Sequence, residues 1–325
     1  MPEISVILPT FERAQMLRAS AQSVLDQSFR DLELIIVDDG STEDIAAAAA
    51  GLDDPRVVYI RREQNGGAAA ARNTGLGHAR GRFIAFQDSD DLWLPGKLEQ
   101  HLELLRHLPE SVGVVTGVKI LYGRDQKHRY GDGLVALAPD PAGRLKPEED
   151  QVRRFLVSNR LSLQNALFRR TAYPGTSWFD PRAKANNDWE FAARLAQKTT
   201  IHEDSQPVVV AFVSGDSIST RPRKKALGLL RILKNNRSVF RRYPDAAAAN
   251  YLQLARLLGR AGHRRLALRF IGGAVLLHPR LVTQAIGPLR KLMKAPQAVP
   301  LRQRPAARSG ALRLAPIEPA VKRQA

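Results

Sequence analysis

Apolar runs alternate with amphipathic segments along the first third of the chain. The apolar runs predict strands at 4–9, 32–37, 57–60 and 83–86, and the segments with helical spacing predict helices at 14–27, 42–52 and 68–79. Strands that alternate with helices at this spacing form βαβ units and a parallel sheet. The pattern therefore predicts an α/β fold with a mostly parallel central sheet flanked by helices.

The pattern changes twice further along the chain. Residues 110–220 are less regular, with strands expected at 112–120 and 208–213 and a mobile loop, rich in Pro, Gly and charge, at 134–150. Helical spacing then returns beyond Arg221. It predicts helices near 222–242, 246–260, 264–277 and 280–293.

The last 31 residues have several prolines, many arginines and no periodicity, which is typical of disorder. We therefore expect three regions: a globular domain at 1–220, a helical region at 221–294 and a disordered tail at 295–325. A chain of 325 residues, 44% of them hydrophobic, is long enough for one sizeable domain and a smaller one.

Charge divides the chain at the same place. Residues 1–220 hold 26 bases and 30 acids, whereas residues 221–325 hold 24 Lys plus Arg and two acids, Asp245 and Glu318. The net charge of +18 therefore comes from the last third, which stands at +22. Such asymmetry favours attraction to a polyanion, either anionic lipid, an acidic glycan or nucleic acid. Nucleic acid is the least favoured of these, because few aromatic residues are interleaved with the basic ones.

The compartment is indicated by what the chain does not contain. It has no cysteine, which excludes disulfides and thiolate metal sites. Its first residues do not form a signal peptide, and its apolar stretches fall far short of the roughly 20 residues that cross a bilayer. We expect a cytoplasmic protein, or one that is peripheral on the inner face of the cell membrane.

Polar side chains follow three of the predicted strands, in the segments 9–12, 38–41 and 88–91. The carboxyl ends of parallel strands share one edge of a sheet, where ligands bind. The third segment places Asp88, Asp90 and Asp91 within four residues. Carboxylates this close repel unless water or a cation separates them, and Mg²⁺ or Mn²⁺ would bring phosphate oxygens as partners. An isolated cluster of this kind is more often a solvated turn, so the surrounding sequence decides.

That surrounding sequence resembles the family 2 glycosyltransferases, inverting enzymes with a GT-A nucleotide-sugar fold. The resemblance covers residues 4 to about 220. It rests on Ser5–Phe11, Ser23–Ser28, Ile36–Ser41, Gly67 with Ala71–Asn73, and Gln87–Trp93, five motifs in family order and at family-like spacing. It implies transfer of a sugar from a nucleotide-diphosphate sugar, with a UDP-sugar favoured, to a hydroxyl group of a cell-surface glycan or a lipid-linked precursor.

The resemblance assigns the donor-binding residues. Pro9, Thr10 and Phe11 would line the base pocket, and Asp39 would hydrogen-bond the base. Arg72, on a helix that follows a Gly pair, would bind phosphate, as both a helix N-terminus and a guanidinium favour. Asp38 is expected to brace its turn instead. Glu12 stands where the family commonly has Asn, which leaves its role open.

The same resemblance assigns the acidic motif. Asp90 would be the direct ligand of Mg²⁺ or Mn²⁺, with Asp88 nearer the ribose or the metal, and Asp91 would face the sugar or the acceptor. The metal would stabilise the charge that develops on the leaving diphosphate. Many relatives carry a His shortly before a Ser-Ile-Ser, but residues 213–219 contain none, so metal binding here is expected to depend more on the diphosphate.

An inverting transfer also needs a base for the acceptor hydroxyl. The family uses the second acid of an acidic pair that is followed by an aromatic, and this position is Asp188. The first acid is replaced by Asn187. Two other readings stay open: Asp188 could only cap a helix, and Glu190 could serve as the base.

Two alternatives to a transferase are considered. A nucleotidyltransferase would place a Gly-rich loop bearing Lys or Arg after the first strand, which 9–13 does not resemble. A catalytically weakened GT-A-fold binding protein is favoured by the changes at Glu12, Asn187 and Ser214. The retention of all four key carboxylates, at positions 39, 88, 90 and 188, argues for an enzyme. The basic helical region would hold such an enzyme against anionic lipid, near a lipid-linked acceptor.

Overall fold

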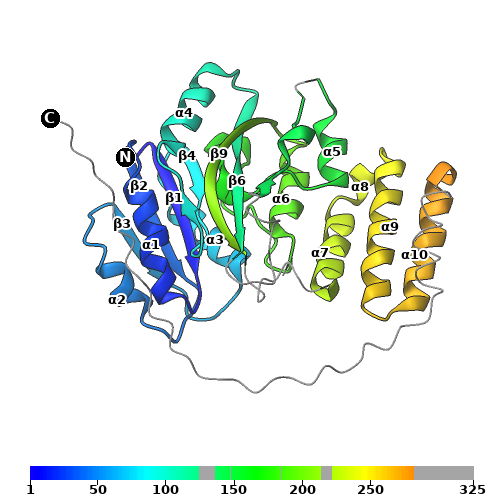
Figure 1. The fold of residues 1–325 in the computed structure, drawn as a ribbon, viewed down its shortest axis with the longest axis horizontal. Coiled ribbons are helices and arrows are strands. Elements are labelled where there is room, and N and C mark those ends of the chain that lie inside the picture. Colours follow the sequence, from blue (N-terminus) through cyan, green and yellow to red (C-terminus); the bar gives the residue numbers. More distant parts are fainter. Residues whose placement is uncertain (124–135, 147, 184, 214–221, 282–325) are drawn as a thin grey trace.

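The fold is a central sheet covered by helices, followed by a row of C-terminal helices (Figure 1). The computed structural model describes residues 1–123, 136–146, 148–183, 185–213 and 222–281. The segment 214–221, most of the helix expected at 280–293 and the tail at 295–325 lie outside the described residues. Among the described helices, none is both long enough and apolar enough to cross a membrane.

The N-terminal half of the sheet is parallel, as the alternating pattern predicted. It consists of β1 (Ile4–Thr10), β2 (Leu32–Asp38), β3 (Val57–Arg61) and β4 (Phe83–Phe86). The connecting helices are α1 (Ala14–Leu25), α2 (Ile45–Ala50) and α3 (Ala68–His78). The strands lie in the order β3-β2-β1-β4, each parallel to its neighbours. This half therefore carries the strand ends that the sequence singles out.

The second half makes the sheet mixed. Its strands are β5 (Leu92–Trp93), β6 (Val112–Gly123), β7 (Ala136–Ala138), β8 (Ala166–Arg169) and β9 (Thr200–Val213). The order continues as β8-β6-β9-β5, with β8 antiparallel to both neighbours and β6 parallel to β9. The loop expected over 134–150 is wrong in part, because β7 pairs with β6 there.

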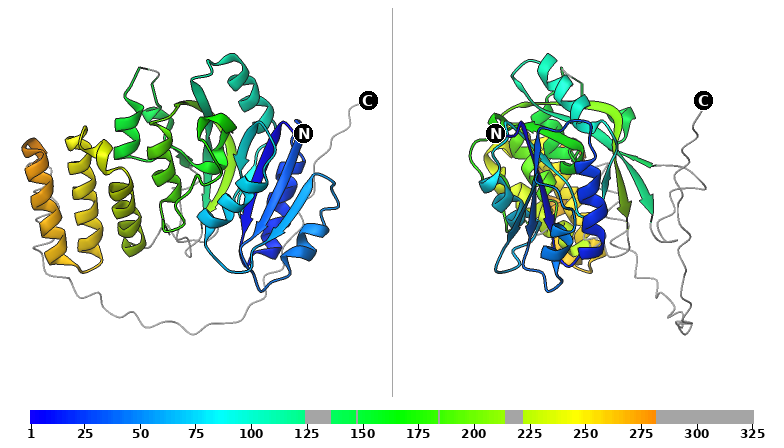
Figure 2. Two further views of the ribbon diagram at one scale, coloured as in Figure 1. Left: turned by 180° about the vertical axis from the view of Figure 1, so that it is seen from behind. Right: turned by 90° about the vertical axis from the view of Figure 1, so that its left-hand side faces the viewer.

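The remaining helices include two that the hydrophobic pattern did not reveal, α4 and α5. They are α4 (Lys97–His107), α5 (Gln151–Val157), α6 (Asn187–Leu195), α7 (Pro222–Asn235), α8 (Arg237–Phe240), α9 (Pro244–Arg260) and α10 (Arg264–Leu277). In both broad views, α10 lies at the opposite end of the molecule from α2 (Figures 1 and 2). The basic helical region therefore extends away from the parallel strands.

Three hydrophobic clusters hold these layers together. One packs α1, α2 and α4 on one face of the sheet through residues such as Leu17, Ile45 and Leu102. A second packs α3 and α6 on the other face, where Trp178 and Phe191 stack with ring centroids 5.5 Å apart. The third joins α5 and α6 to the C-terminal helices. The helical region thus shares a core with the sheet domain.

Candidate functional site

Strand register brings the polar segments together at one edge of the sheet. Thr10, the last residue of β1, is paired with Asp38, the last residue of β2. Ile7 is paired with Phe86, so β4 ends beside β1. The residues that follow each strand are therefore neighbours, although they lie far apart in sequence.

Glu12 ties the first two of these segments to each other. Its carboxylate accepts hydrogen bonds from the Thr42 N–H at 2.7 Å, the Thr42 hydroxyl at 2.9 Å and the Glu43 N–H at 3.2 Å. The Thr42 N–H bond is the largest influence and lowers the pKa of Glu12. The Glu12 side chain, which is longer than the Asn common at this position in the family, thus links the loop after β1 to the loop after β2.

The two acids after β2 have different surroundings. Asp38 is fully buried and accepts from the Ser41 N–H at 2.9 Å and the Tyr59 hydroxyl at 3.0 Å, so it braces the turn as expected. Asp39 accepts from the N–H groups of Gly66 at 3.1 Å and Gly67 at 2.6 Å, and it pairs with Arg62. Asp39 therefore holds the loop that starts α3 against the end of β2.

The first predicted segment lies beside this contact. Pro9 and Thr10 are buried, while Phe11 is 43% exposed. The Thr10 carbonyl accepts the Asp39 N–H at 2.9 Å, which fixes the two loops side by side. Among the described residues, the buried Thr10 hydroxyl has no hydrogen-bond partner, so it can serve a ligand there.

Arg72 connects the parallel half of the sheet to α6. One end of its guanidinium donates to Asp88 at 2.6 Å, and the other donates to the Asn187 side chain at 3.3 Å. Its plane lies over the ring of Phe179, 5.7 Å from the centroid. The change from acid to Asn187 therefore leaves an acceptor for Arg72 while it removes one negative charge.

The acidic motif consists of two partly buried acids, Asp88 and Asp90, and one buried acid, Asp91. Asp88 pairs with Arg72, and Asp90 pairs with Arg13 at 2.5 Å. Asp91 is 5% exposed and accepts from the Gln164 amide at 2.9 Å and the Phe212 N–H at 3.2 Å. Burial, together with the charges of Asp88 and Asp90, raises the pKa of Asp91 to about 7. Asp91 therefore anchors the motif to β9.

The donor set at this strand end can be compared with what a divalent metal ion requires. Asp88 and Asp90 are hard carboxylate donors, and their side chains are 30% and 25% exposed at the same strand end. Within the described ranges, no three His, Cys, Asp or Glu side chains converge as a preformed site. The residues fit an Mg²⁺ or Mn²⁺ ion that takes its other ligands from a bound diphosphate.

Asp188 lies in the first turn of α6, next to Asn187, which Arg72 contacts. It accepts from the Asn159 amide at 3.0 Å and from the Trp189 N–H at 2.8 Å. Burial raises the pKa of Asp188, opposed by the Trp189 N–H and by the charges of Lys119 and Arg72, while Asp88 raises it further. A carboxylate with a raised pKa, close enough to the acidic motif to be influenced by the charge of Asp88, is suited to accept a proton.

Glu190 is placed differently. It is fully buried, pairs with Arg194 at 2.8 Å through both oxygens and accepts from Asn235 of α7 at 2.8 Å. These partners satisfy the carboxylate inside the protein. Glu190 is therefore a structural acid and a poor candidate for the base.

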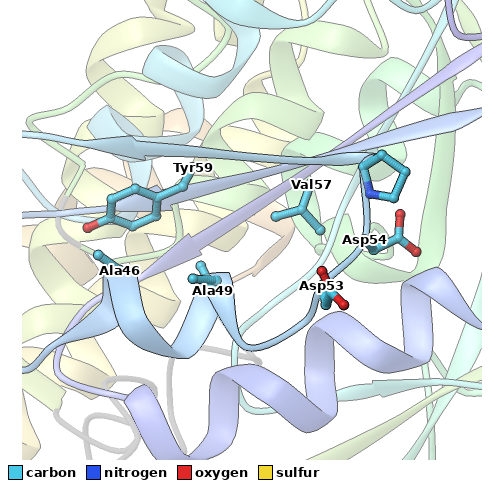
Figure 3. Close-up of a pocket in the computed structure, with 8 residues that line it drawn as sticks. Ala46, Ala49, Asp53, Asp54, Val57 and Tyr59 are labelled. Atoms are coloured by element: carbon cyan, nitrogen blue, oxygen red, sulfur yellow. The ribbon is translucent and has the colours of Figure 1, made fainter.

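A separate depression lies between α2 and β3, lined by Ala46, Ala49, Asp53, Val57 and Tyr59 among others (Figure 3). It contains none of the residues that the sequence motifs single out. The Tyr59 hydroxyl connects it to the site by donating a hydrogen bond to Asp38.

Four residues of this site were not among the residues predicted from the sequence. They are Arg13, Arg62, Asn159 and Gln164. Each acts on a predicted acid from a distant part of the chain; Gln164, for example, lies 73 residues from Asp91. Arg13 alone gave a signal, because it follows the first motif directly. The others are visible only once the sheet is assembled.

Comparisons with known proteins place the chain in a family. Residues 5–175 match the sequence profile described as Glycosyl transferase family 2. The chain is 39% identical over 102 residues to UDP-Glc:alpha-D-GlcNAc-diphosphoundecaprenol beta-1,3-glucosyltransferase WfgD of Escherichia coli, which covers 31% of this chain and 40% of that protein. It is 40% identical over 101 residues to GalNAc(5)-diNAcBac-PP-undecaprenol beta-1,3-glucosyltransferase of Campylobacter jejuni, covering 30% and 33%. The chain thus matches less than half the length of these relatives.

Solved structures show the same fold. The mannosyltransferase PcManGT from Pyrobaculum calidifontis, in complex with GDP-Man and Mn²⁺, superposes with a TM-score of 0.58 over 89% of this chain and 81% of that one, at 19% identity. S. aureus TarS 1–349 in complex with UDP-GlcNAc gives a TM-score of 0.56 over 90% of each chain, at 17% identity. Both likenesses confirm the predicted GT-A fold.

Proposed function

The chain belongs to glycosyl transferase family 2, and we propose that it transfers a sugar, with inversion, from a nucleotide-diphosphate sugar to a hydroxyl group of a cell-surface glycan or its lipid-linked precursor. The observation that carries the proposal is the Arg72 bridge. Arg72 bonds Asp88 of the donor motif and Asn187, the residue before Asp188. A donor held at the sheet edge and a base on α6 are thereby kept in one site.

The donor half would work through the loops at the strand ends. Pro9, Thr10 and Phe11 would line the base pocket, with Asp39 bonding the base at the same edge. Arg72 would bind a phosphate, since a guanidinium matches phosphate geometry. Asp90 and Asp88 would hold Mg²⁺ or Mn²⁺, which when bound neutralises the diphosphate and the charge that develops on it.

The acceptor half would work through Asp188. The acceptor oxygen forms a bond to the anomeric carbon while the bond from that carbon to the diphosphate oxygen breaks. The hydroxyl proton passes to the Asp188 carboxylate, and the diphosphate leaves with the electron pair of the broken bond. Asn159 holds the carboxylate through its 3.0 Å hydrogen bond. The raised pKa of Asp188 suits this proton transfer.

The substrates are proposed from the relatives. The names of the Escherichia coli and Campylobacter jejuni relatives describe glucosyl transfer to undecaprenol-linked diphosphate sugars. The TarS structure is a complex with UDP-GlcNAc, whereas the PcManGT structure is a complex with GDP-Man and Mn²⁺. These names favour a UDP-sugar donor and a polyprenol-linked acceptor for this chain.

The acceptor would place the enzyme at the inner face of the cell membrane. Residues 222–281 contain fourteen Lys or Arg residues and one acid, Asp245. On α10, Ala267, Ile271 and Ala274 face the core, while Leu268 and Leu276 are 46% and 85% exposed. A helix with basic residues and exposed leucines is suited to an anionic lipid surface. Flotation with anionic vesicles should show binding that salt reduces, and binding only to zwitterionic vesicles would contradict this.

Turnover with a donor panel tests the reaction. Wild-type protein would be assayed for hydrolysis or transfer with Mg²⁺ or Mn²⁺, beside Asp90→Ala, Asp188→Asn and the exposed control Glu63→Gln. Donor-selective, metal-dependent turnover that both site variants lose and the control keeps would support the proposal. Absence of turnover with every donor and a polyprenol-linked acceptor would contradict it.

A further inference from the structure

The helical region packs on the segment that carries the proposed base. Asp188 lies at the second residue of α6, which Asn186 precedes in a left-handed conformation with φ 54°. The turn at Ala185 and Asn186 therefore sets the position and direction of the first turn of α6. Helix α7 contacts this turn directly.

Gly228 of α7 makes the closest contact. A Cβ at this position would lie 2.5 Å from the Ala185 carbonyl oxygen and 3.0 Å from the Asn186 side-chain nitrogen. A separation of 2.5 Å from backbone is far below van der Waals contact, so a side chain here would move the turn or the helix. Glycine in a helix interior is unfavourable by up to about 1 kcal/mol relative to Ala. The close approach of α7 to the Ala185 carbonyl oxygen gives a physical reason for a glycine at position 228.

Asn235, seven residues further along α7, adds polar contacts. Its amide donates to Glu190 of α6 at 2.8 Å and to Asp180 at 3.1 Å. Burial alone would raise the pKa of Asp180, but hydrogen bonds from Arg182 and Asn235 lower it. Asn235 therefore joins α6 to the loop that leads into it.

The apolar contacts fix the same face. Trp189 and Ala193 of α6 belong to one buried cluster with Leu229 and Ile232 of α7. The Trp189 indole N–H also donates to the Phe155 carbonyl of α5 at 2.6 Å. The residue next to Asp188 is thus fixed by the helical region and by α5.

We propose that α7 is a positioning element for catalysis, in which Gly228 and Asn235 fix the location of Asp188 relative to the donor. The inference rests on the proposed role of Asp188. It gives the helical region a part in the reaction itself, in addition to any contact with lipid.

The test compares glycine variants in two helices of the full-length protein. Gly228→Ala should lower kcat by tenfold or more, because the added methyl displaces the turn before α6, while the KM for the sugar nucleotide should change less than twofold. Gly272→Ala is the matched control, since Gly272 is exposed on α10 and an added Cβ would meet nothing within 4 Å. It should match wild type. Thermal midpoints would show that both variants are folded at the assay temperature.

Asn235→Ala provides the second variant, because it removes hydrogen bonds without adding volume. It should lower kcat about threefold or more with an unchanged KM for the sugar nucleotide. If Gly228→Ala does not fold, this variant alone tests the positioning role of α7. Wild-type kcat in folded Gly228→Ala, or in Asn235→Ala where the glycine variant does not fold, would overturn the positioning role. Wild-type protein without turnover would instead overturn the proposed function.

Discussion

Two N–H donors hold the carboxylate of Asp188 in place, one from the backbone and one from a side-chain amide. The Trp189 N–H donates to one oxygen and the Asn159 side chain donates to the other. The side-chain carbonyl oxygen of Asn159 accepts a hydrogen bond from the Leu161 N–H at 3.0 Å. The side-chain amide must therefore present its NH₂ group to Asp188. These two hydrogen bonds thus fix the orientation of the Asp188 carboxylate.

Replacement of Asp188 by Asn should separate binding from chemistry. We expect kcat to fall by about 10²–10⁴-fold, the usual contribution of a general base, with donor affinity retained. Burial raises the pKa of Asp188, and a base must be deprotonated to act. The wild-type kcat/KM should therefore rise with pH, with an apparent pKa above the ordinary Asp pKa of about 3.9. This acidic limb should be absent in the variant, as a pH–rate profile would show.

Asn159→Asp should move the same limb. A second carboxylate within hydrogen-bonding distance of Asp188 disfavours its ionised form and raises its pKa. The acidic limb of kcat/KM should therefore shift to higher pH, and activity at mildly acidic pH should fall. An unchanged limb with a lower thermal midpoint would assign Asn159 a structural role only.

At this scale, the sequence predicted the acids but not their partners. Asp39, Asp88, Asp90 and Asp188 could be proposed from the sequence because the motifs that contain them are short and local. The Arg72 contact to Asn187 spans 115 residues, and the Asn159 contact to Asp188 spans 29. No local pattern encodes such distances, so these bonds required the assembled sheet.

At the scale of elements, α3 depends on how it begins. Its N-cap, Gly67, has φ 87°, a conformation that residues with a Cβ adopt at a cost, and its N–H donates to Asp39. The start of the helix and the orientation of the Arg72 side chain therefore depend on one glycine and one carboxylate.

Gly67→Ala should destabilise the fold by about 1–3 kcal/mol, because φ 87° with ψ 166° is a backbone conformation that is essentially restricted to glycine. Gly77→Ala in the same helix is the control, because Gly77 is exposed with nothing within 4 Å of an added Cβ. It should stabilise the protein by up to about 1 kcal/mol. Urea unfolding of both variants would measure the difference, and equal effects would contradict the role of Gly67.

The parallel strands and their helices were predictable because each one repeats a simple hydrophobic pattern. The short strand β7 was not, since its three residues lie in a segment rich in Pro and Gly and pair with β6 only through tertiary contact. The α4 helix was also missed, although Leu98, Leu102 and Leu105 share its buried face.

At the scale of the molecule, the change in charge at residue 221 is not matched by a break in the core. The third hydrophobic cluster includes Trp189 of α6 and Leu229 of α7. Arg153 of α5 pairs with Asp245 of α9, and Asn250 of α9 donates to the Leu156 carbonyl at 2.7 Å. Composition reveals surface charge, but it cannot show which buried faces meet.

The shared core should make unfolding cooperative. Leu229→Ala, at a position that is 1% exposed, should cost about 2–5 kcal/mol and lower the midpoint of the whole protein. Leu227→Ala, two residues earlier and 59% exposed, should change stability by about 0.5 kcal/mol or less. Calorimetry should show one transition that moves in the first variant. An early, separate transition for the helical region would contradict the shared core.

The pairing of Arg13 with Asp90 has a consequence for the order in which ligands arrive. A cation that reaches Asp90 alone must compete with a guanidinium that carries the same sign of charge. A diphosphate that arrives with the cation gives that guanidinium a new counter-ion, so the two ligands assist each other's binding. Under the proposed function, this ion pair would make the two binding events cooperative: a metal ion alone would bind weakly, and a metal ion together with a nucleotide would bind strongly.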